Sequence, residues 1–427
     1  MRLSPPPAEK SPPASGGPAR LWLAAGLCLA AVVLTGLTAG PARAQAQKAS
    51  RRAAPYKVAV FAPLLPRYEP NAPYAAALQR ILARQSWGKR VEQHFYPPNA
   101  LSEPAVVSQA LESLADDPEV KAVILGGSPQ GSLEGCARLR TRRPDILIIA
   151  LDPEEDPQLM NRVASLTLTL NHAARGFLIP TLAQRMEASA LVYFSFPRHQ
   201  RLGFFLRQRR IMTEVARDLG LVVITAPNCP DPLTTEKAEL EAYVATVLER
   251  YRERFGRKLA LYATDDALSE ILIHYALKNG DLALDPVHPG LFLGLPEPLG
   301  LLKTTREVFG QLRRLLTLED ERYMSLGLEG QVSTWAGPYP QTAILAMIDT
   351  AVSAIEKQTD FYDLNYLTAA LEKYSPGDKW AVSVVRDYDN DVIVPQLVVV
   401  MADSYWFGHG YQGFTRLNIP TKYYRLK

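Results

Sequence analysis

Polar residues that directly follow apolar segments are the first candidates for chemistry in this chain. Residues 190–197 read ALVYFSFP, and Arg198 and His199 come next. The guanidinium group of Arg198 offers a planar pair of donors to a carboxylate, a phosphate or a diol, and the imidazole of His199 can donate or accept a hydrogen bond. We therefore take Ser195, Arg198 and His199 as candidate ligand contacts. The alternative for Arg198 is an ion pair with a surface carboxylate.

Three more polar residues are placed in the same way. Ser128 follows two glycines, Asp152 follows the apolar run at 145–151, and Asp265 follows the run that ends near residue 263. Carboxylates at such positions can accept hydrogen bonds from sugar hydroxyls or amines. A tight turn at Ser128 and helix capping by the two aspartates are the simpler alternatives.

A basic run and two aromatic residues complete the candidate set. In the run at 207–210 a solvated helix face is the simpler interpretation for any one arginine, and Arg210 is the member that we expect to reach a ligand. Trp335 and Tyr339 are expected near a chain crossing, where aromatic rings can stack on a sugar or a nucleobase. Packing at the crossing is the alternative for both.

Sequence motifs of enzymes are missing. The run at 127–131 (GSPQG) lacks the second glycine that a nucleophile elbow requires two residues after its serine. The chain has no phosphate-binding glycine loop with its lysine, and its 6 histidines are scattered without metal-ligand spacing. We expect no enzymatic activity, no metal and no cofactor. A hydrolase that uses Ser128 is the rival hypothesis.

These residues need a scaffold that brings them together, and the hydrophobic pattern predicts one. Apolar strands are predicted at residues 56–62, 90–96, 120–126 and 145–151, and helices at 72–83, 103–115 and 133–140. The same alternation follows residues 163–170, with strands predicted at 191–196, 221–226, 258–263 and 290–295 and helices at 204–219, 234–255 and 266–279. Continuously apolar strands separated by helices indicate parallel sheets that are covered on both faces.

The predicted fold class is α/β, with two doubly wound parallel-sheet lobes joined by a hinge that the chain crosses several times. The first lobe is expected to contain residues 56–172 and 335–375, and the second residues 173–334 and 376–427. Ligands of open α/β sheets bind beyond the carboxyl ends of the strands, so the cleft between the lobes is the expected site.

The first 44 residues have the pattern of a cleavable signal peptide. Arg2, Lys10 and Arg20 give a positive leader, residues 21–37 an apolar core, and residues 42–44 (ARA) a small-x-small cleavage site. We expect export to the periplasm and a mature chain that begins near Gln45. A membrane anchor is the alternative.

Removal of this leader leaves about 380 residues, enough for two lobes of ordinary size. The formal net charge of +3 is nearly balanced, which gives no support for binding to nucleic acid or to an anionic membrane. We expect a monomer. Cys136 and Cys229 either form one bridge or stay as two buried thiols, and their distant spacing favours the thiols.

Two short signatures resemble a known family. Residues 193–199 (YFSFPRH) followed by 209–212 (RRIM) are similar to the strand-to-helix signature of a bacterial family of exported proteins of unknown function. Residues 333–335 (STW) are similar to a second signature of that family. The order of elements also resembles the type I periplasmic binding proteins, the group of the ribose and autoinducer receptors.

The resemblance implies a binding protein and specifies no ligand. We expect a periplasmic solute-binding protein that closes on a small polar ligand for uptake through an ABC-type inner-membrane permease. The alternative partner is a sensor kinase or a chemoreceptor, since both kinds of partner use the outer faces of the closed lobes.

Overall fold

The computed structural model describes residues 55–62, 82–97, 99–100, 102–287, 295, 298–308, 311–337, 339–357, 359–360, 362–387 and 392–425. The expected signal peptide at 1–44 lies outside the described residues. So do residues 72–81 of one predicted helix and 290–294 of one predicted strand. In the described part of the chain, no helix combines the length and the apolar character needed to cross a membrane.

The first sheet contains the four strands that were expected for the first lobe, a fifth strand from the segment at 163–170, and two more from the C-terminal part of the chain. Its order is β11-β12-β5-β4-β3-β1-β2, and all neighbours are parallel except the β11–β12 pair. The strands are β1 (Lys57–Ala62), β2 (Val91–Phe95), β3 (Val120–Leu125), β4 (Leu147–Leu151), β5 (Leu166–Leu170), β11 (Trp380–Asp387) and β12 (Val392–Ala402).

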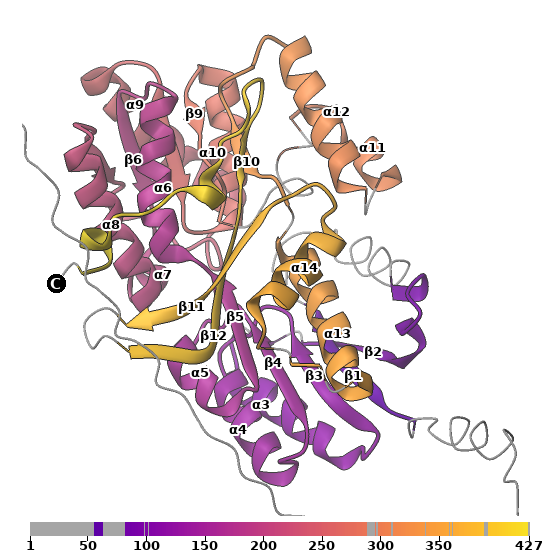
Figure 1. Ribbon diagram of the computed structural model, residues 1–427. Coiled ribbons are helices and arrows are strands. Elements are labelled where there is room, and N and C mark those ends of the chain that lie inside the picture. Colours follow the sequence, from indigo (N-terminus) through magenta and orange to yellow (C-terminus); the bar gives the residue numbers. More distant parts are fainter. Residues whose placement is uncertain are drawn as a thin grey trace, which may run out of the picture. The chain divides into compact units, whose positions relative to one another are not determined.

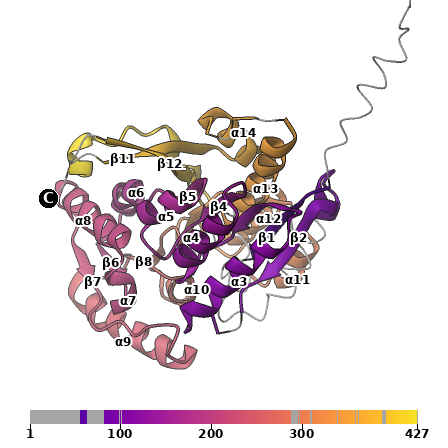
Figure 2. The ribbon, with the colours of Figure 1, turned by 90° about the horizontal axis from the view of Figure 1, so that it is seen from below.

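The apolar strands of this sheet are buried on both faces because helices cover each side. Helices α3 (Pro104–Ser113) and α4 (Ser132–Arg142) pack their apolar residues against one face. Helix α13 (Tyr339–Lys357) packs against the other, and α14 (Leu364–Tyr374) lies beside it (Figure 2). Alternate residues of β3 show the consequence, because Ala122 and Ile124 contact the α13 side while Val123 and Leu125 contact the α3 side.

The second sheet has the order β7-β6-β8-β9 and is parallel throughout. Its strands are β6 (Ala190–Phe194), β7 (Val223–Thr225), β8 (Leu259–Ala263) and β9 (Leu282–Ala283). Helices α6 (His172–Arg185) and α8 (Gly203–Asp218) contribute to the core on one face, and α9 (Lys237–Phe255) and α10 (Asp266–Asn279) to that on the other. Helices α5 (Pro157–Val163), α7 (Pro197–Gln200), α11 (Leu302–Glu307) and α12 (Leu312–Ser325) complete the described set.

Within the described residues the chain passes between the two sheets three times. It does so from β5 into α6, from β10 (Ser333–Trp335) into α13, and from β12 into β13 (Ser404–Trp406) (Figure 1). Backbone hydrogen bonds hold the three crossings side by side: Asn171 donates to the carbonyl of Val400 at 2.9 Å, and Ala336 donates to that of Asp403 at 3.0 Å. Strands β10, β13 and β14 (Gly410–Tyr411) form a small antiparallel sheet at these crossings.

The expected assignment of residues 376–427 to the second lobe needs correction over β11 and β12. Strand β12 pairs in parallel with β5, with Leu397 opposite Thr167, so this hairpin extends the first sheet. The last described segment does pack on the second sheet's helices, because Lys422 and Tyr423 both contact the carboxylate of Asp218 on α8.

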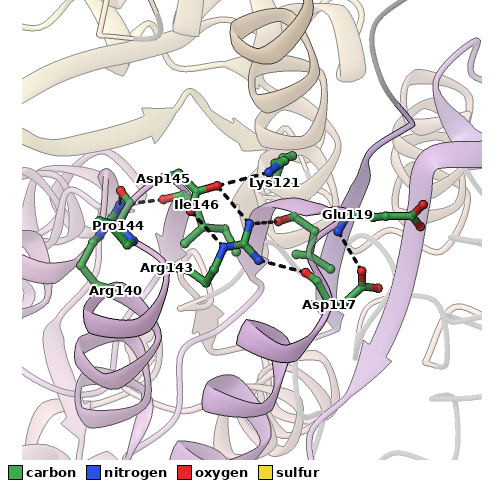
Figure 3. A network of polar contacts seen from close by, with 9 residues as sticks. Asp117, Glu119, Lys121, Arg140, Arg143, Pro144, Asp145 and Ile146 are labelled. Atoms are coloured by element: carbon green, nitrogen blue, oxygen red, sulfur yellow. Dashed lines mark hydrogen bonds and ion pairs between the residues drawn. The ribbon is translucent and has the colours of Figure 1, made fainter.

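The amino ends of β3 and β4 are joined by a polar network (Figure 3). The guanidinium group of Arg143 donates to both carboxylate oxygens of Asp145, at 2.9 and 3.0 Å, and to the carbonyls of Asp117 and Val120 at 3.0 Å. Lys121 adds a second cation at 3.3 Å from Asp145. This network connects the loops at the sheet edge opposite to the carboxyl ends of the strands.

Candidate functional site

A cavity of about 420 Å³ is lined by residues that follow the carboxyl ends of strands from both sheets. From the first lobe it is lined by Gln130 and Glu154, which lie in the loops after β3 and β4. From the second lobe it is lined by Arg198, which belongs to the helix after β6, and by Arg201 and Leu202, which follow that helix. The volume falls within the range of small-molecule sites, and the polar groups converge from both lobes.

The second-lobe wall is built by the short helix α7. Pro197 occupies its first position, where the missing N–H is not needed, and Gln200 donates a side-chain hydrogen bond to the carbonyl of Ser195 at 2.6 Å. This turn places Arg198 at the cavity, with its guanidinium group 5.0 Å from the ring centroid of Phe196. The strand-to-helix sequence therefore fixes the position of one cation.

Arg198 is also held by a carboxylate that sequence reasoning missed. Its Nε and Nη2 donate to the two oxygens of Asp231 at 3.0 and 3.2 Å. Burial alone would raise the pKa of Asp231, but the hydrogen bonds from Arg198 and from the backbone N–H of Leu233 hold that pKa below its ordinary value. Arg198 thus forms the ion pair that was named as its alternative, and it also lines the cavity, while its contact with a ligand stays a prediction.

Ser195 and His199 both contact the hydroxyl of Thr264. The hydroxyl of Thr264 donates to Ser195 Oγ at 3.1 Å and lies 3.3 Å from His199 Nδ1. Ser195 is fully buried, and the imidazole ring packs on Phe196 and Phe205. The predicted pair therefore supports the cavity wall. Since Thr264 stands between serine and histidine, the pair does not have the direct contact of a nucleophile and its base.

Asp265 caps helix α10, as the simpler interpretation expected. Its Oδ1 accepts from the backbone N–H of Ala267 at 2.9 Å. Burial, followed by the nearby carboxylate of Asp266, raises the pKa of Asp265 to about 6 despite the opposing effect of Arg198. A capping role and a position beside the cavity cation are compatible.

On the first-lobe wall, Ser128 shapes the loop that carries Glu154. Its N–H and its hydroxyl both donate to the carbonyl of Leu151, at 2.9 and 3.1 Å, and its own carbonyl accepts from the N–H of Glu154 at 2.9 Å. Burial raises the pKa of Glu154, and the cation of Arg198 opposes that shift. Ser128 is fully buried, so its hydroxyl positions the wall and is not free for a ligand.

The same wall depends on a glycine at the start of α4. Gly131 has φ +91°, and a Cβ there would lie 2.1 Å from the carbonyl oxygen of Pro104. Only glycine fits both the left-handed backbone and the close approach of α3. The turn that presents Gln130 to the cavity therefore requires Gly131.

Asp152 lies at the end of β4 in the left-handed region, with φ 41°. Its Oδ1 accepts from Thr169 Oγ1 and from the N–H of Leu170, both at 3.0 Å, which ties β4 to β5. The buried hydroxyl of Tyr339 lies beside this carboxylate, and burial together with that negative charge raises the pKa of Tyr339 well above its ordinary value. Asp152 and Tyr339 thus meet where the chain enters α13.

Trp335 and Arg210 are not brought to the cavity. Trp335 is buried under the guanidinium group of Arg175, 4.4 Å from the ring centroid, and Arg175 also donates to the carbonyls of Asp285 and Pro286 at 3.0 and 2.7 Å. This is packing at the crossing, the alternative named for the aromatic residues. Arg210 is exposed on α8, as the solvated-face interpretation expected.

Other features of the site bear on its chemistry. Cys136 and Cys229 are buried free thiols, which confirms the favoured alternative. Among the described residues, no three His, Cys, Asp or Glu side chains are placed to hold one metal ion. The cavity residues that sequence reasoning missed are Gln130, Glu154, Arg201, Leu202 and the supporting Asp231.

Residues 56–332 match the model of a family described as "Protein of unknown function (DUF3798)". The chain belongs to this family. A second family model matches residues 344–426. The resemblance drawn from the two signatures is therefore confirmed at the level of the family.

Two proteins of Treponema pallidum (strain Nichols), both described as uncharacterized, are similar in sequence to this member of the DUF3798 family. One is 28% identical over 173 residues, which are 40% of this chain and 80% of the relative. The other is 31% identical over 137 residues, which are 32% of this chain and 62% of the relative. Neither relative indicates a function for this chain.

This family member is similar in fold to a solved structure. A structure from Clostridium difficile 630, described as a candidate transcriptional regulator, has a TM-score of 0.66 at 16% identity and covers 82% of this chain and 99% of its own. A periplasmic sugar-binding protein of an ABC sugar transporter from Legionella pneumophila has a TM-score of 0.47 at 12% identity, covering 71% and 97%. The expected type I periplasmic binding protein fold is confirmed.

Proposed function

We propose that this protein is an exported solute-binding protein that closes on a small polar ligand and presents it to an ABC-type permease. The observation that carries the proposal is the cavity of about 420 Å³, whose polar lining comes from both lobes. A ligand in such a cavity contacts both walls only when they are close together. It therefore stabilises the closed state by its differential affinity for that state.

The electrostatics of the two walls support this closure. Glu154 on the first lobe and Arg198 on the second interact across the cavity. Two hydrogen bonds to Asp231 fix the side chain of Arg198, and a backbone hydrogen bond to Ser128 fixes the main chain at Glu154. Each wall is therefore supported from within its own lobe. Export is supported by the leader pattern at residues 1–44.

The experiment is to identify and return the ligand. We expect mass spectrometry of the gently denatured protein to release a small polar compound. When it is added back to the emptied protein, the radius of gyration in small-angle scattering should fall. At a hundredfold excess over the dissociation constant, the free energy of unfolding should rise by about 2.7 kcal/mol.

Two results would contradict the proposal. One is a compound that binds without any change in the radius of gyration, which would argue against closure. The other is chemical turnover of the compound by the pure protein that is abolished in Ser128→Ala, which would revive the hydrolase hypothesis.

A further inference from the structure

The balance of charge around the cavity limits the kind of ligand that it can take. The guanidinium group of Arg198 gives two of its donors to Asp231, and its Nη1 lies 3.4 Å from His199 Nε2. Its positive charge is therefore already balanced by a carboxylate of the same lobe. A ligand anion would have to compete with Asp231 for the same donors.

Glu154 is in the opposite situation. It lines the cavity, and in the described part of the chain its carboxylate has no hydrogen bond and no ion pair within 4.0 Å. Glu155 beside it raises the electrostatic cost of its negative charge, and Arg198 only partly offsets this cost. A partly buried carboxylate without a direct partner favours a ligand group that can donate hydrogen bonds and carry positive charge.

The second wall adds negative charge near the same cation. Asp265 interacts with Arg198 from the start of α10, and Asp266 lies next to it. Of the residues that line the cavity, Glu154 has a carboxylate, and Arg198 and Arg201 have guanidinium groups. The charge of Arg198 is balanced by Asp231, and Arg201 is exposed to solvent, so Glu154 is the lining carboxylate for which a ligand cation can supply the direct partner.

We propose that the ligand of this cavity carries a protonated amine that pairs with Glu154 from the first lobe while the rest of the molecule contacts the Arg198 wall. This inference rests on the proposed function and specifies the chemical class of its ligand. Burial also raises the pKa of Glu154 and that of Asp265, so the carboxyl groups of this region gain from a nearby positive charge.

The test uses three four-carbon probes that differ in charge and share a length: putrescine, 1,4-butanediol and succinate. Each is added to the emptied full-length protein at pH 7.5 and matched ionic strength, and binding is followed by thermal shift and calorimetry. L-Lysine and agmatine extend the amine set to larger molecules. We expect amines to raise the melting temperature and the diol and the diacid to leave it unchanged.

Variants locate the effect. Glu154→Gln keeps the shape and removes the charge, and it should weaken amine binding roughly ten- to a hundredfold, the range for loss of a charge-assisted pair. The matched control is Glu241→Gln, at an exposed position of α9, which should bind amines like the unaltered protein. The melting temperature of each variant without probe shows that it is folded.

The outcomes separate the class of ligand from the function. If the co-purifying compound lacks an amine, if the diol or succinate binds as well as putrescine, or if Glu154→Gln binds amines normally, the amine assignment is wrong. Closure on a neutral or anionic compound would leave the binding function standing. If no amine in the set binds and no compound co-purifies, both proposals fail.

Discussion

At Arg198 a single side chain serves two purposes. Its guanidinium group is fixed by Asp231 and by the ring of Phe196, and the same group forms part of the cavity wall. The side chains of Arg198 and Asp231 stay 33% and 22% exposed, so their attraction is weakened by solvent and is smaller than that of a fully buried pair. The pair therefore positions the cation more than it stabilises the fold.

Arg198→Ala should lower the free energy of unfolding by about 1 kcal/mol, because Asp231 loses both donors while it stays half-buried. Urea unfolding measures the change. The control is Arg142→Ala, whose exposed pair with Asp116 should be worth less than about 0.5 kcal/mol. Equal losses in the two variants would show that the Asp231 pair is no more than a surface contact.

Asp265 gives stability a dependence on pH. Its folded pKa of about 6 lies above the ordinary value of 3.8, so between these values the folded state holds a proton that the unfolded state has lost. Stability from this group is present below about pH 4 and is lost as the pH rises through 6. Burial is the main cause of the raised pKa and Asp266 adds to it, whereas Arg198 and the N–H groups of Ala267 and Leu268 oppose it.

Relative to the unaltered protein, the free energy of unfolding of Asp265→Asn should therefore rise by roughly 1 kcal/mol between pH 4.5 and 7, because asparagine caps a helix equally well without charge. Unfolding in urea at several pH values checks this. The control is Asp156→Asn, the same change at an exposed cap that accepts from Gln158. Parallel pH profiles for both variants would contradict the prediction.

Part of this site could be predicted from the sequence. Ser195, Arg198 and His199 follow β6 directly, and the end of a parallel strand faces the cleft in any fold of this class. Glu154 and Asp231 lie farther along their loops. Their positions depend on tertiary contacts, such as the hydrogen bond from the Glu154 N–H to the Ser128 carbonyl, and no residue pattern in the sequence predicts these contacts.

At the scale of elements, the turn before α4 is sterically constrained at Gly131. Gly131 and Gly220 both have positive φ, of +91° and +71°, but only at Gly131 would a Cβ meet backbone atoms. A comparison of alanine substitutions at the two glycines therefore distinguishes the cost of backbone strain from the cost of steric overlap.

Gly131→Ala should destabilise the fold by roughly 3 kcal/mol or more, because the α3 backbone has to move away from the new Cβ. Gly220→Ala, where nothing lies within 4 Å, should cost about 1 kcal/mol from φ alone. Thermal unfolding of both variants tests this. A Gly131→Ala protein as stable as Gly220→Ala would mean that α3 yields without cost.

Arg175 joins α6 to the segments around it, since it contacts Trp335 and donates to two carbonyls of the β9 loop. Arg175→Met should lower the free energy of unfolding by roughly 3 kcal/mol, because it removes these hydrogen bonds and leaves the buried carboxylate of Asp285 without its nearby cation. The control on the same helix is Arg185→Met, an exposed residue that donates to the carbonyl of Gln412. Chemical unfolding compares the two, and similar losses would argue against a special role for the buried arginine.

Most of the described helices and strands follow from the sequence because each apolar run is short and lies next to an amphipathic segment, but the two-residue strand β9 (Leu282–Ala283) was not predicted. The partner of β12 does not follow in the same way. A valine-rich strand such as Val392–Ala402 fits the edge of either sheet, and it reaches β5 because the chain stays with the first sheet between its second and third crossings.

At the scale of the whole molecule, export should determine where the mature chain begins. We expect N-terminal sequencing of the native protein to find a start at or near Gln45, because the residues 42–44 present small side chains on either side of Arg43. Fractionation gives the control. A native protein that retains residues 21–37 and sediments with membranes would contradict cleavage.

The pairing of β12 with β5 also bears on how the molecule is made. The first sheet draws its strands from residue 57 at one extreme and from residue 402 at the other. Until the ribosome has added β12, the edge of β5 keeps unpaired backbone groups that invite association with other chains. The native fold of this lobe is therefore reached only after nearly all of the chain has been synthesised. Delayed folding of this kind keeps a polypeptide in a form that a secretion channel can thread.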